Sequence, residues 1–270
     1  MSAAPRLEVA PSFAHFAGDA LAPRLIDAAS RMTPASADEL NRASLQRRFD
    51  RKFLLPTDAA GPLLELVAHD YHVVLAGEAR FAQYDTVYFD TPDLRFYHDH
   101  RRRRRPRVKV RIRHYIDRGF SMLEVKQKTV KGDTVKHRWQ RESNEMTLTE
   151  AEQALVAGAV APIKLDVALA PQARTRFSRL MLVGTRSIER ATLDFELELE
   201  HRARRRPVRF VVVEVKDTGR GAQSPLLLAL RAAHAKQRSF SKYSVAVASL
   251  SDERTTSLRP LVTLVDRGLR

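Results

Sequence analysis

The sequence contains no cysteine and few aromatic residues, and both features limit the classes of function that the protein can have. Without cysteine the chain can form neither disulfides nor thiolate metal sites. Phe, Trp and Tyr make up only 7% of the residues. This scarcity disfavours a nucleic-acid binder, because proteins that bind single strands stack the bases on exposed aromatic rings. We therefore expect no nucleic-acid partner.

Long hydrophobic runs are also missing. A membrane-spanning helix needs about 20 consecutive apolar residues, and the sequence has no such stretch. The N-terminus lacks a basic segment followed by an apolar one, so it does not resemble a signal peptide. These absences predict a protein of the cytoplasm without a membrane span.

Positive charge is what the chain has in excess. Of its 270 residues, 47 are Lys or Arg and 32 are Asp or Glu, which gives a net charge of +15. Hydrophobic residues make up 44%, so a sizeable core is expected. The excess of cations indicates a polyanionic partner, either nucleic acid, an acidic membrane surface or a phosphate-rich ligand.

The composition divides the chain into three parts. Residues 1–43 are rich in Ala, Pro and Ser, and we expect a partly disordered leader there. Residues 44–250 form the expected domain, and residues 251–270 form a tail. Within the domain, period-two patterns predict strands at 45–56, 84–92, 105–115, 119–128, 134–142, 186–200 and 207–217, with a further basic strand near 180. Helices are expected at 57–70, 148–158 and 224–237, while 239–248 fits either a strand or a helix start.

Four cations alternate with β-branched residues in the segment RVKVRIR. Arg107, Lys109, Arg111 and Arg113 would lie on one face of a strand, and Val108, Val110 and Ile112 on the other. A single strand of this kind usually turns its polar face to water. The alternation recurs in other strands, however. The cations concerned are Arg48, Lys52, Arg107, Lys109, Arg111, Arg113, Lys126, Lys128, Lys136, Arg138, Arg179, Arg190, Lys216 and Lys242.

A sheet with charged polar faces can close so that these faces point inward. We therefore predict an α+β fold in which a closed antiparallel β-barrel forms a basic tunnel, with helices packed on the outside. Such a tunnel would bind a phosphate chain, since Arg grips phosphate oxygens with a planar fork. The carboxylates of Asp50, Glu124, Asp194 and Glu214 have two interpretations. They are either ion-pair partners of the cations or ligands of a hard divalent cation.

The order of these motifs resembles a known family. RFDRKFLL, YFDTPDLRFY, RVKVRIRHY, FSMLEVKQK, TVKHR, FSR, RATLD, VVEVK and SFSKYS follow one another over about residues 44–247. Together they are similar to the VTC (vacuolar transporter chaperone) domain, the polyphosphate polymerase branch of the CYTH, or triphosphate tunnel metalloenzyme, superfamily. The resemblance implies transfer of the ATP γ-phosphate to polyphosphate with Mn²⁺ or Mg²⁺.

The resemblance also implies roles for individual residues. Arg111, Arg113 and Lys242 would be catalytic, and Glu214 would bind the metal, with Glu124 as a second candidate. The substrate-binding residues that the resemblance implies are Lys52, Lys126, Lys136 and Arg179, and the charge pattern adds Arg107, Lys109 and Arg190. Larger members of the family carry membrane spans that this sequence lacks, so polymer translocation would need a separate partner, such as a membrane protein.

The sequence departs from the family pattern at three places. Asp50 stands where a Glu is usual, and Phe177 where a Tyr is expected. The run Arg101–Arg105 replaces an ordinary loop, and it fits a solvated turn as well as a mouth that attracts polyphosphate. Two further functions stay open beside the polymerase. They are hydrolysis of a triphosphate in the same tunnel, and polyanion binding without catalysis.

Overall fold

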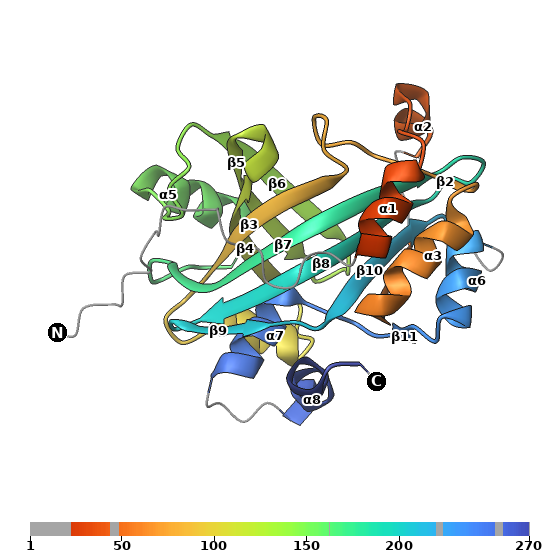
Figure 1. The fold of residues 1–270 in the computed structure, drawn as a ribbon. Coiled ribbons are helices and arrows are strands. Elements are labelled where there is room, and N and C mark those ends of the chain that lie inside the picture. Colours follow the sequence, from red (N-terminus) through yellow and green to blue (C-terminus); the bar gives the residue numbers. More distant parts are fainter. Residues whose placement is uncertain (1–22, 44–48, 162, 220–223, 252–255, 270) are drawn as a thin grey trace.

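The computed structural model describes residues 23–43, 49–161, 163–219, 224–251 and 256–269, and one antiparallel sheet dominates it (Figure 1). The strands are β1 (Phe49–Pro56), β2 (Tyr71–Val73), β3 (Phe81–Asp90), β4 (Arg107–Tyr115), β5 (Phe120–Lys128), β6 (Thr134–Arg141), β7 (Ala170–Gly184), β8 (Arg190–His201), β9 (Arg204–Pro207), β10 (Phe210–Asp217) and β11 (Lys236–Gln237). The helices are α1 (Pro23–Arg31), α2 (Ala37–Arg42), α3 (Ala60–Val67), α4 (Arg95–Arg101), α5 (Glu150–Ala159), α6 (Pro225–Ala232), α7 (Lys242–Leu250) and α8 (Arg259–Arg267). The predicted α+β class is confirmed.

The sheet has 11 strands in the order β11-β1-β10-β8-β7-β3-β4-β5-β6, with β2 added to β7 and β9 to β8. Every ladder between these strands is antiparallel. Among the described residues no ladder joins β6 to β1 or β11. The expected antiparallel sheet is therefore confirmed, but hydrogen bonds do not close it into a barrel in this part of the chain.

Two hydrophobic clusters cover the face of the sheet that carries the β-branched residues. The first packs α1, α3 and α6 against β1, β10, β8 and β7, with Leu25, Leu64 and Leu227 among its buried side chains. The second packs α5 against β3, β4 and β5 through Val156 and Val160. Figure 1 shows the two groups of helices at opposite ends of the sheet. The predicted packing of helices on this outer face is confirmed.

The opposite face of the sheet, which we call the inner face, is partly filled by α7 and α8. Tyr243 and Val247 of α7 lie in one cluster with Tyr88 of β3, Phe177 of β7 and Phe210 of β10. The segment 239–248, for which strand and helix both remained open, is therefore helical from Lys242 onward. Its side chains are buried on nearly all sides, which explains why its Val and Ala residues show no helical stripe.

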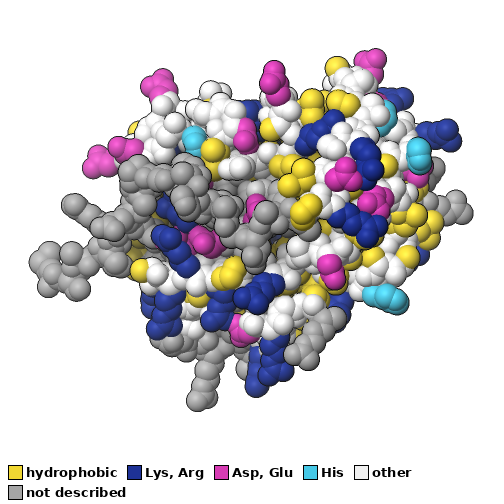
Figure 2. Space-filling model, in the orientation of Figure 1, with side chains coloured by type: hydrophobic (Ala, Val, Ile, Leu, Met, Phe, Trp, Pro, Cys, Tyr) yellow, Lys and Arg dark blue, Asp and Glu magenta, His cyan; other side chains and the backbone are white. Residues whose placement is uncertain are grey.

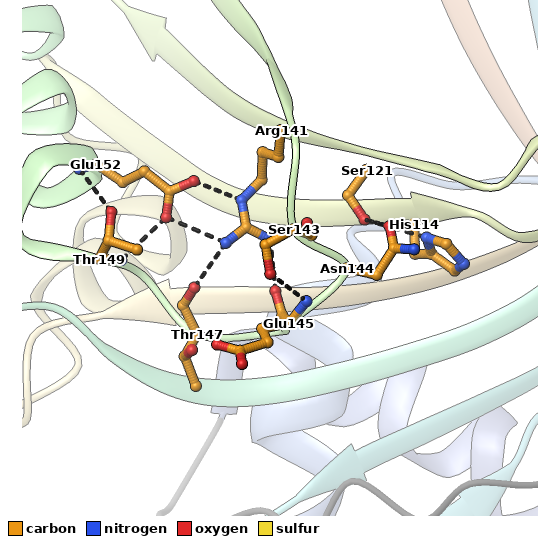
Figure 3. Close-up of polar contacts among 9 residues, drawn as sticks. All are labelled: His114, Ser121, Arg141, Ser143, Asn144, Glu145, Thr147, Thr149 and Glu152. Carbon is orange, nitrogen blue, oxygen red and sulfur yellow. Dashed lines mark hydrogen bonds and ion pairs between the residues drawn. The ribbon is translucent and has the colours of Figure 1, made fainter.

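The connection from β6 to α5 is held by one buried arginine, shown in Figure 3. Arg141 donates to the backbone oxygens of Thr147 at 2.9 Å and Ser143 at 3.3 Å, and it forms an ion pair with Glu152. Glu152 also completes a capping box with Thr149 at the start of α5. Because Arg141 fixes both the loop and the helix start, α5 is held against β5.

The segments on either side of the expected domain contribute to the packing. Residues 1–22 of the expected leader lie outside the described residues. From Pro23 onward the leader forms α1 and α2, and Leu25 and Met32 are buried in the first cluster. In the expected tail, Val265 of α8 is buried in the hydrophobic cluster that α7 forms on the inner face. No helix of the described ranges is long and apolar enough to cross a membrane.

Candidate functional site

The strand register places the predicted cations on the inner face. Residues directly opposite each other in a ladder share a face. Arg111 lies opposite Glu124, and Lys109 lies opposite Lys126. At the other side of the sheet, Lys52 lies opposite Glu214. The valines that alternate with these residues are buried under the outer helices. The alternation read from the sequence therefore separates the charged face from the apolar face, as predicted.

The two ends of the strand order approach each other across the inner face. Lys126 lies on β5 with its side chain exposed, and its partial desolvation and then the adjacent Lys136 lower its pKa. The charges of Asp50 and Lys52 on β1 also act on this lysine, as does Glu214 on β10. Since β5 and β1 are near opposite ends of the order, the sheet must be curled. Its charged side chains act on one another across the concave side of the sheet, and we call this region the inner cavity.

Glu124 forms ion pairs with two arginines in this cavity. It accepts from Arg111 Nε at 2.6 Å and pairs with Arg138 Nε at 3.0 Å. Burial opposes ionisation of Glu124, but Arg111 and Arg113 outweigh burial and lower the pKa of this carboxyl to about 2. Each of its oxygens has an arginine partner. This arrangement favours the ion-pair interpretation of Glu124 over the predicted metal ligation.

Asp194 joins Arg179 to Lys242. Arg179 donates to the two carboxylate oxygens at 2.5 and 2.9 Å, and Lys242 Nζ forms an ion pair with the same group. Burial would raise the pKa of Asp194, but the two cations hold it well below its ordinary value. Lys242 is itself affected, because burial lowers its pKa to about 8 against the attraction of Asp194.

The ring of Phe177, where the family pattern predicts Tyr, serves as a platform for cations. Lys242 Nζ lies 4.2 Å from the ring centroid, and the guanidinium of Arg179 lies 5.2 Å from it. Phe177 stacks on Tyr84, whose ring is 5.1 Å from the guanidinium of Arg113. Cation–π contacts of this kind stabilise positive charge without neutralising it. The departure from Tyr therefore removes a hydroxyl but keeps the aromatic face.

Glu214 is the carboxylate best suited to a metal. It pairs with Lys52 at 2.7 Å and lies 3.9 Å from Lys216. Burial would raise its pKa, but these lysines lower it to about 2, so the group is ionised near neutral pH. No group of three or more Asp, Glu or His side chains in the described part of the chain lies close enough to hold a metal ion. A cation here would need oxygens from a ligand as well.

Several cations of the inner cavity lack a carboxylate partner among the described residues. Lys109 Nζ donates to Ser241 Oγ at 3.0 Å, and Arg113 Nε donates to Thr86 Oγ1 at 3.2 Å. Burial and the charges of Lys126 and Arg111 lower the pKa of Lys109 to about 7. Burial followed by Arg111 likewise lowers the pKa of Arg113. The cavity therefore carries positive charge that the described part of the chain does not balance.

The outer helix α1 is different, because its arginines occur in ion pairs. On the face drawn in Figure 2, acidic and basic side chains are interspersed. Arg24 of α1 pairs with Glu65 of α3 at 2.7 Å, for example. Arg31 pairs with Asp27 within α1. These two arginines of α1 are thus balanced by nearby carboxylates, unlike Lys109 and Arg113 of the cavity.

The remaining predicted residues lie farther from this group. Lys136 is exposed on β6 opposite Lys126. Arg107 is half-buried at the start of β4, and burial and Arg105 lower its pKa. Arg190 lies on the inner face, but its guanidinium donates to the backbone oxygen of Leu40 in α2. The structure thus brings Arg107 and Lys136 to the edge of the cavity, while Arg190 is held by the N-terminal helices.

Three contributors to the cavity were not predicted. Ser241 caps α7 and accepts from Lys109. Tyr84 lies two residues before Thr86 on β3 and therefore on the same, inner face. The alternation in the sequence could have predicted this position. Asp90 accepts from the backbone N–H groups of Phe96 and Tyr97 at 2.8 Å, and from the hydroxyl of Tyr243. Asp90 therefore ties α4 to α7.

The structure is a curled antiparallel sheet whose inner face is rich in cations. A comparison with protein families finds a family that matches this chain. The VTC domain family matches residues 47–251. The chain belongs to this family, as the sequence motifs indicated. Comparison with curated proteins finds no match.

Three solved structures show a distant likeness. A proposed adenylate cyclase from Bacillus halodurans has 16% identity and a TM-score of 0.44, over 71% of this chain and 92% of that chain. One from Vibrio parahaemolyticus has 13% identity and a TM-score of 0.45, over 75% and 98%. A proposed adenylyl cyclase from Hippeastrum, described as having a dominant triphosphatase activity, has 14% identity and a TM-score of 0.45, over 75% and 96%.

Proposed function

We propose that the chain is a polyphosphate polymerase that transfers the γ-phosphate of ATP to a polyphosphate chain inside the inner cavity. The observation that carries this proposal is the convergence of Lys126, Lys52 and Glu214 from the two ends of the strand order. We infer that the walls enclose a tunnel even though no ladder joins β6 to β1. A phosphate chain in this tunnel would neutralise Lys109, Lys126 and Arg113, none of which forms a close ion pair with a carboxylate among the described residues.

The proposed reaction forms and breaks one bond at the γ-phosphorus. A terminal oxygen of the polyphosphate attacks this phosphorus, the bond to the oxygen between the β- and γ-phosphates breaks, and ADP leaves with that oxygen. The polyphosphate grows by one phosphate. Phosphoryl transfer of this kind depends mainly on alignment and on stabilisation of charge.

The cavity residues divide this work between them. Arg111 and Arg113 are adjacent inward residues of β4 and would bind the equatorial oxygens of the transferred group, where charge is spread in the transition state. Lys242, held by Asp194, would stabilise the leaving or attacking oxygen. Lys52, Lys126 and Arg179 would align the two phosphate chains. Their arrangement on several strands suits a long, extended ligand.

A divalent cation, Mn²⁺ or Mg²⁺, would offset the negative charge of the phosphates when bound. Glu214 is the residue that would hold it, as one carboxylate beside the phosphate oxygens of the substrates. Glu124 fits this role less well, because two arginines lie within 3.0 Å of its oxygens, whereas among the described residues only Lys52 lies that close to Glu214.

An assay of reaction products tests the proposal. Purified protein is incubated with ATP and Mn²⁺, and the products are separated on a gel that resolves phosphate chains by length. Long chains that form with wild type and with Arg31→Ala, an outer-helix control, but not with Arg111→Ala, would support the polymerase. Release of orthophosphate from triphosphate alone would identify a hydrolase instead. Salt-sensitive binding of polyphosphate without turnover would indicate a protein that binds polyanions but does not catalyse a reaction.

A further inference from the structure

The loop between α4 and β4 carries a run of arginines at the edge of the inner cavity. Helix α4 ends at Arg101 and strand β4 begins at Arg107. The arginines between them, at positions 102 to 105, are all exposed. We call residues 102–105 the arginine loop. The family resemblance gives these residues no role.

The backbone of the arginine loop is held in place. The N–H of Arg102 donates to the backbone oxygen of His98, and that of Arg104 to the backbone oxygen of Asp99, both at 2.9 Å. The N–H of Arg103 donates to the backbone oxygen of His100 at 3.2 Å. These bonds continue the end of α4, so the arginines project from a defined turn.

The loop also reaches the turn between β5 and β6. A Cβ atom added at Gly132 would lie 2.9 Å from Arg105 Nη1, so the guanidinium of Arg105 stands against this turn. Lys131 precedes Gly132 and is exposed. The β5–β6 turn therefore adds a further cation beside the arginine loop.

These cations lie close together with little compensating charge. The one ion pair recorded for the loop, among the described residues, joins Arg104 to Asp99 at 3.9 Å. Arg103 and Arg105 both act on Arg107 and, after burial, lower its pKa. Arg104 pairs only at the limit of an ion pair, which in water contributes little. The loop therefore presents nearly its full charge to solvent.

The charge of the loop continues into the cavity along β4. Alternate residues of a strand are about 6.6 Å apart and point to one face, so Arg107 and Lys109 lead inward from Arg105. His100 of α4 lies beside this path. Burial, Lys109, Arg107 and Lys126, in that order, lower its pKa to about 3. His100 is therefore neutral at physiological pH and adds no positive charge to the path.

We propose that the arginine loop, together with Lys131, is a second anion-binding surface that holds the part of a polyphosphate chain lying outside the cavity. The loop directly precedes β4, which carries Arg107 and Lys109, and this continuity suits a polyanion that extends beyond the cavity. The loop has no aromatic side chain on which a nucleic-acid base could stack. The identity of the ligand rests on the proposed function, whereas the anion-binding surface itself does not.

The test compares long and short phosphate chains. We substitute Arg103→Asn, Arg104→Ser and Arg105→Ser together, with Asn at position 103 because its φ of 55° is tolerated by Asn. Binding of a labelled polyphosphate of about 60 phosphates should weaken at least tenfold. Its dependence on salt should become less steep, because a complex with fewer phosphate contacts releases fewer counterions when it forms. Binding of tripolyphosphate should stay unchanged, because three phosphates fit within the cavity.

A matched control removes the same charge elsewhere. Arg204→Ser, Arg205→Ser and Arg206→Ser alter the basic strand β9, and this variant should bind both ligands as wild type does. Thermal unfolding verifies that each variant is folded. If the loop variant does not fold, Lys131→Ala provides a second test, with a smaller loss that is again confined to the long chain.

The possible outcomes separate this inference from the proposed function. Unchanged affinity for the long chain, or an equal loss for both chains, would overturn the second surface even if the protein makes polyphosphate. Loss for the long chain alone would support the surface even if no polymerase activity is found. Single-stranded RNA of equal charge that competes as well as polyphosphate would overturn the assignment of the ligand.

Discussion

Binding of ATP should be coupled to proton uptake, because two lysines of the inner cavity are partly neutral in the free protein. The pKa of Lys109 is lowered from 10.5 to about 7 by burial and by neighbouring cations. That of Lys242 is lowered from 10.5 to about 8 by burial, which outweighs the attraction of Asp194. A bound phosphate chain supplies the missing negative charge, so it should raise the pKa of both amines and draw protons from solution.

The magnitude of this coupling follows from the two pKa values. At pH 8 about 0.9 of the Lys109 side chains and about half of the Lys242 side chains are neutral in the free protein. Full protonation in the complex therefore takes up about 1.4 protons at pH 8 and about 0.1 at pH 6. For Lys109 the difference of about 3.5 pKa units corresponds to about 5 kcal/mol, before screening by the water that reaches this half-buried side chain.

Isothermal titration calorimetry measures the uptake directly. ATP is titrated into protein with a chelator present, so that no turnover occurs, in two buffers with different heats of ionisation. At pH 8 the γ-phosphate, with a pKa near 6, is already ionised and contributes little. Lys109→Arg should reduce the uptake by about 0.9 proton, because Arg stays charged throughout. Lys236→Arg, a control on the exposed strand β11, should leave it unchanged.

Two results would refute this reasoning. Uptake near zero for wild type at pH 8 would mean that the lysines are already charged, and hence that the cations do not share one cavity. An unchanged uptake in Lys109→Arg would mean that the protons go elsewhere.

The remaining predictions concern catalysis, metal dependence and stability. Arg111→Ala and Lys242→Ala should each lower ATP turnover at least about tenfold, or about 1.4 kcal/mol in the barrier, and near-normal rates in both would remove them from the site. Glu214→Gln should weaken the dependence of turnover on Mn²⁺, so an identical metal titration would contradict its assignment. Arg141→Ala should lower the free energy of unfolding in urea by about 3 kcal/mol, because it leaves the buried end of Glu152 unpaired, and a loss below about 1 kcal/mol would contradict this role. Glu124, whose pKa is lowered from 4.5 to about 2, should stabilise the fold above pH 4.5 and lose this contribution as the pH falls toward 2; Glu124→Gln should flatten that pH dependence of urea unfolding.

The sequence predicts the division between the charged and apolar faces well, for a simple reason. Side chains alternate with a period of two along any strand, so Lys109 and Arg111 must share a face once β4 is recognised. The direction of that face follows from the buried valines between them. Neither step requires knowledge of the tertiary structure.

The sequence does not predict where a long side chain finds its partner. Arg190 has the same parity as Thr192 and Asp194 on β8, but it donates to Leu40, which is 150 residues away in the chain. That contact depends on how α2 packs at the end of the sheet. The segment around Lys242 was equally ambiguous, because a helix buried on all sides shows no amphipathic period.

The pairing of the carboxylates also needed the three-dimensional structure. The sequence left ion-pair and metal-binding interpretations open for Glu124 and Glu214. In the structure each group faces two cations, and the two groups differ in how close the second cation lies. Glu124 has an arginine on each oxygen, whereas Glu214 has one close lysine and a second at 3.9 Å.

A crystal structure of the protein with a non-hydrolysable ATP analogue tests the central claim most directly. Convergence of the cations predicts that phosphate oxygens lie about 2.7–2.9 Å from charged nitrogens of Lys52 on β1, Lys126 on β5 and Lys242 on α7 in the same complex. An analogue bound on the outer surface, or in contact with cations of one strand only, would contradict the existence of a shared phosphate-binding cavity.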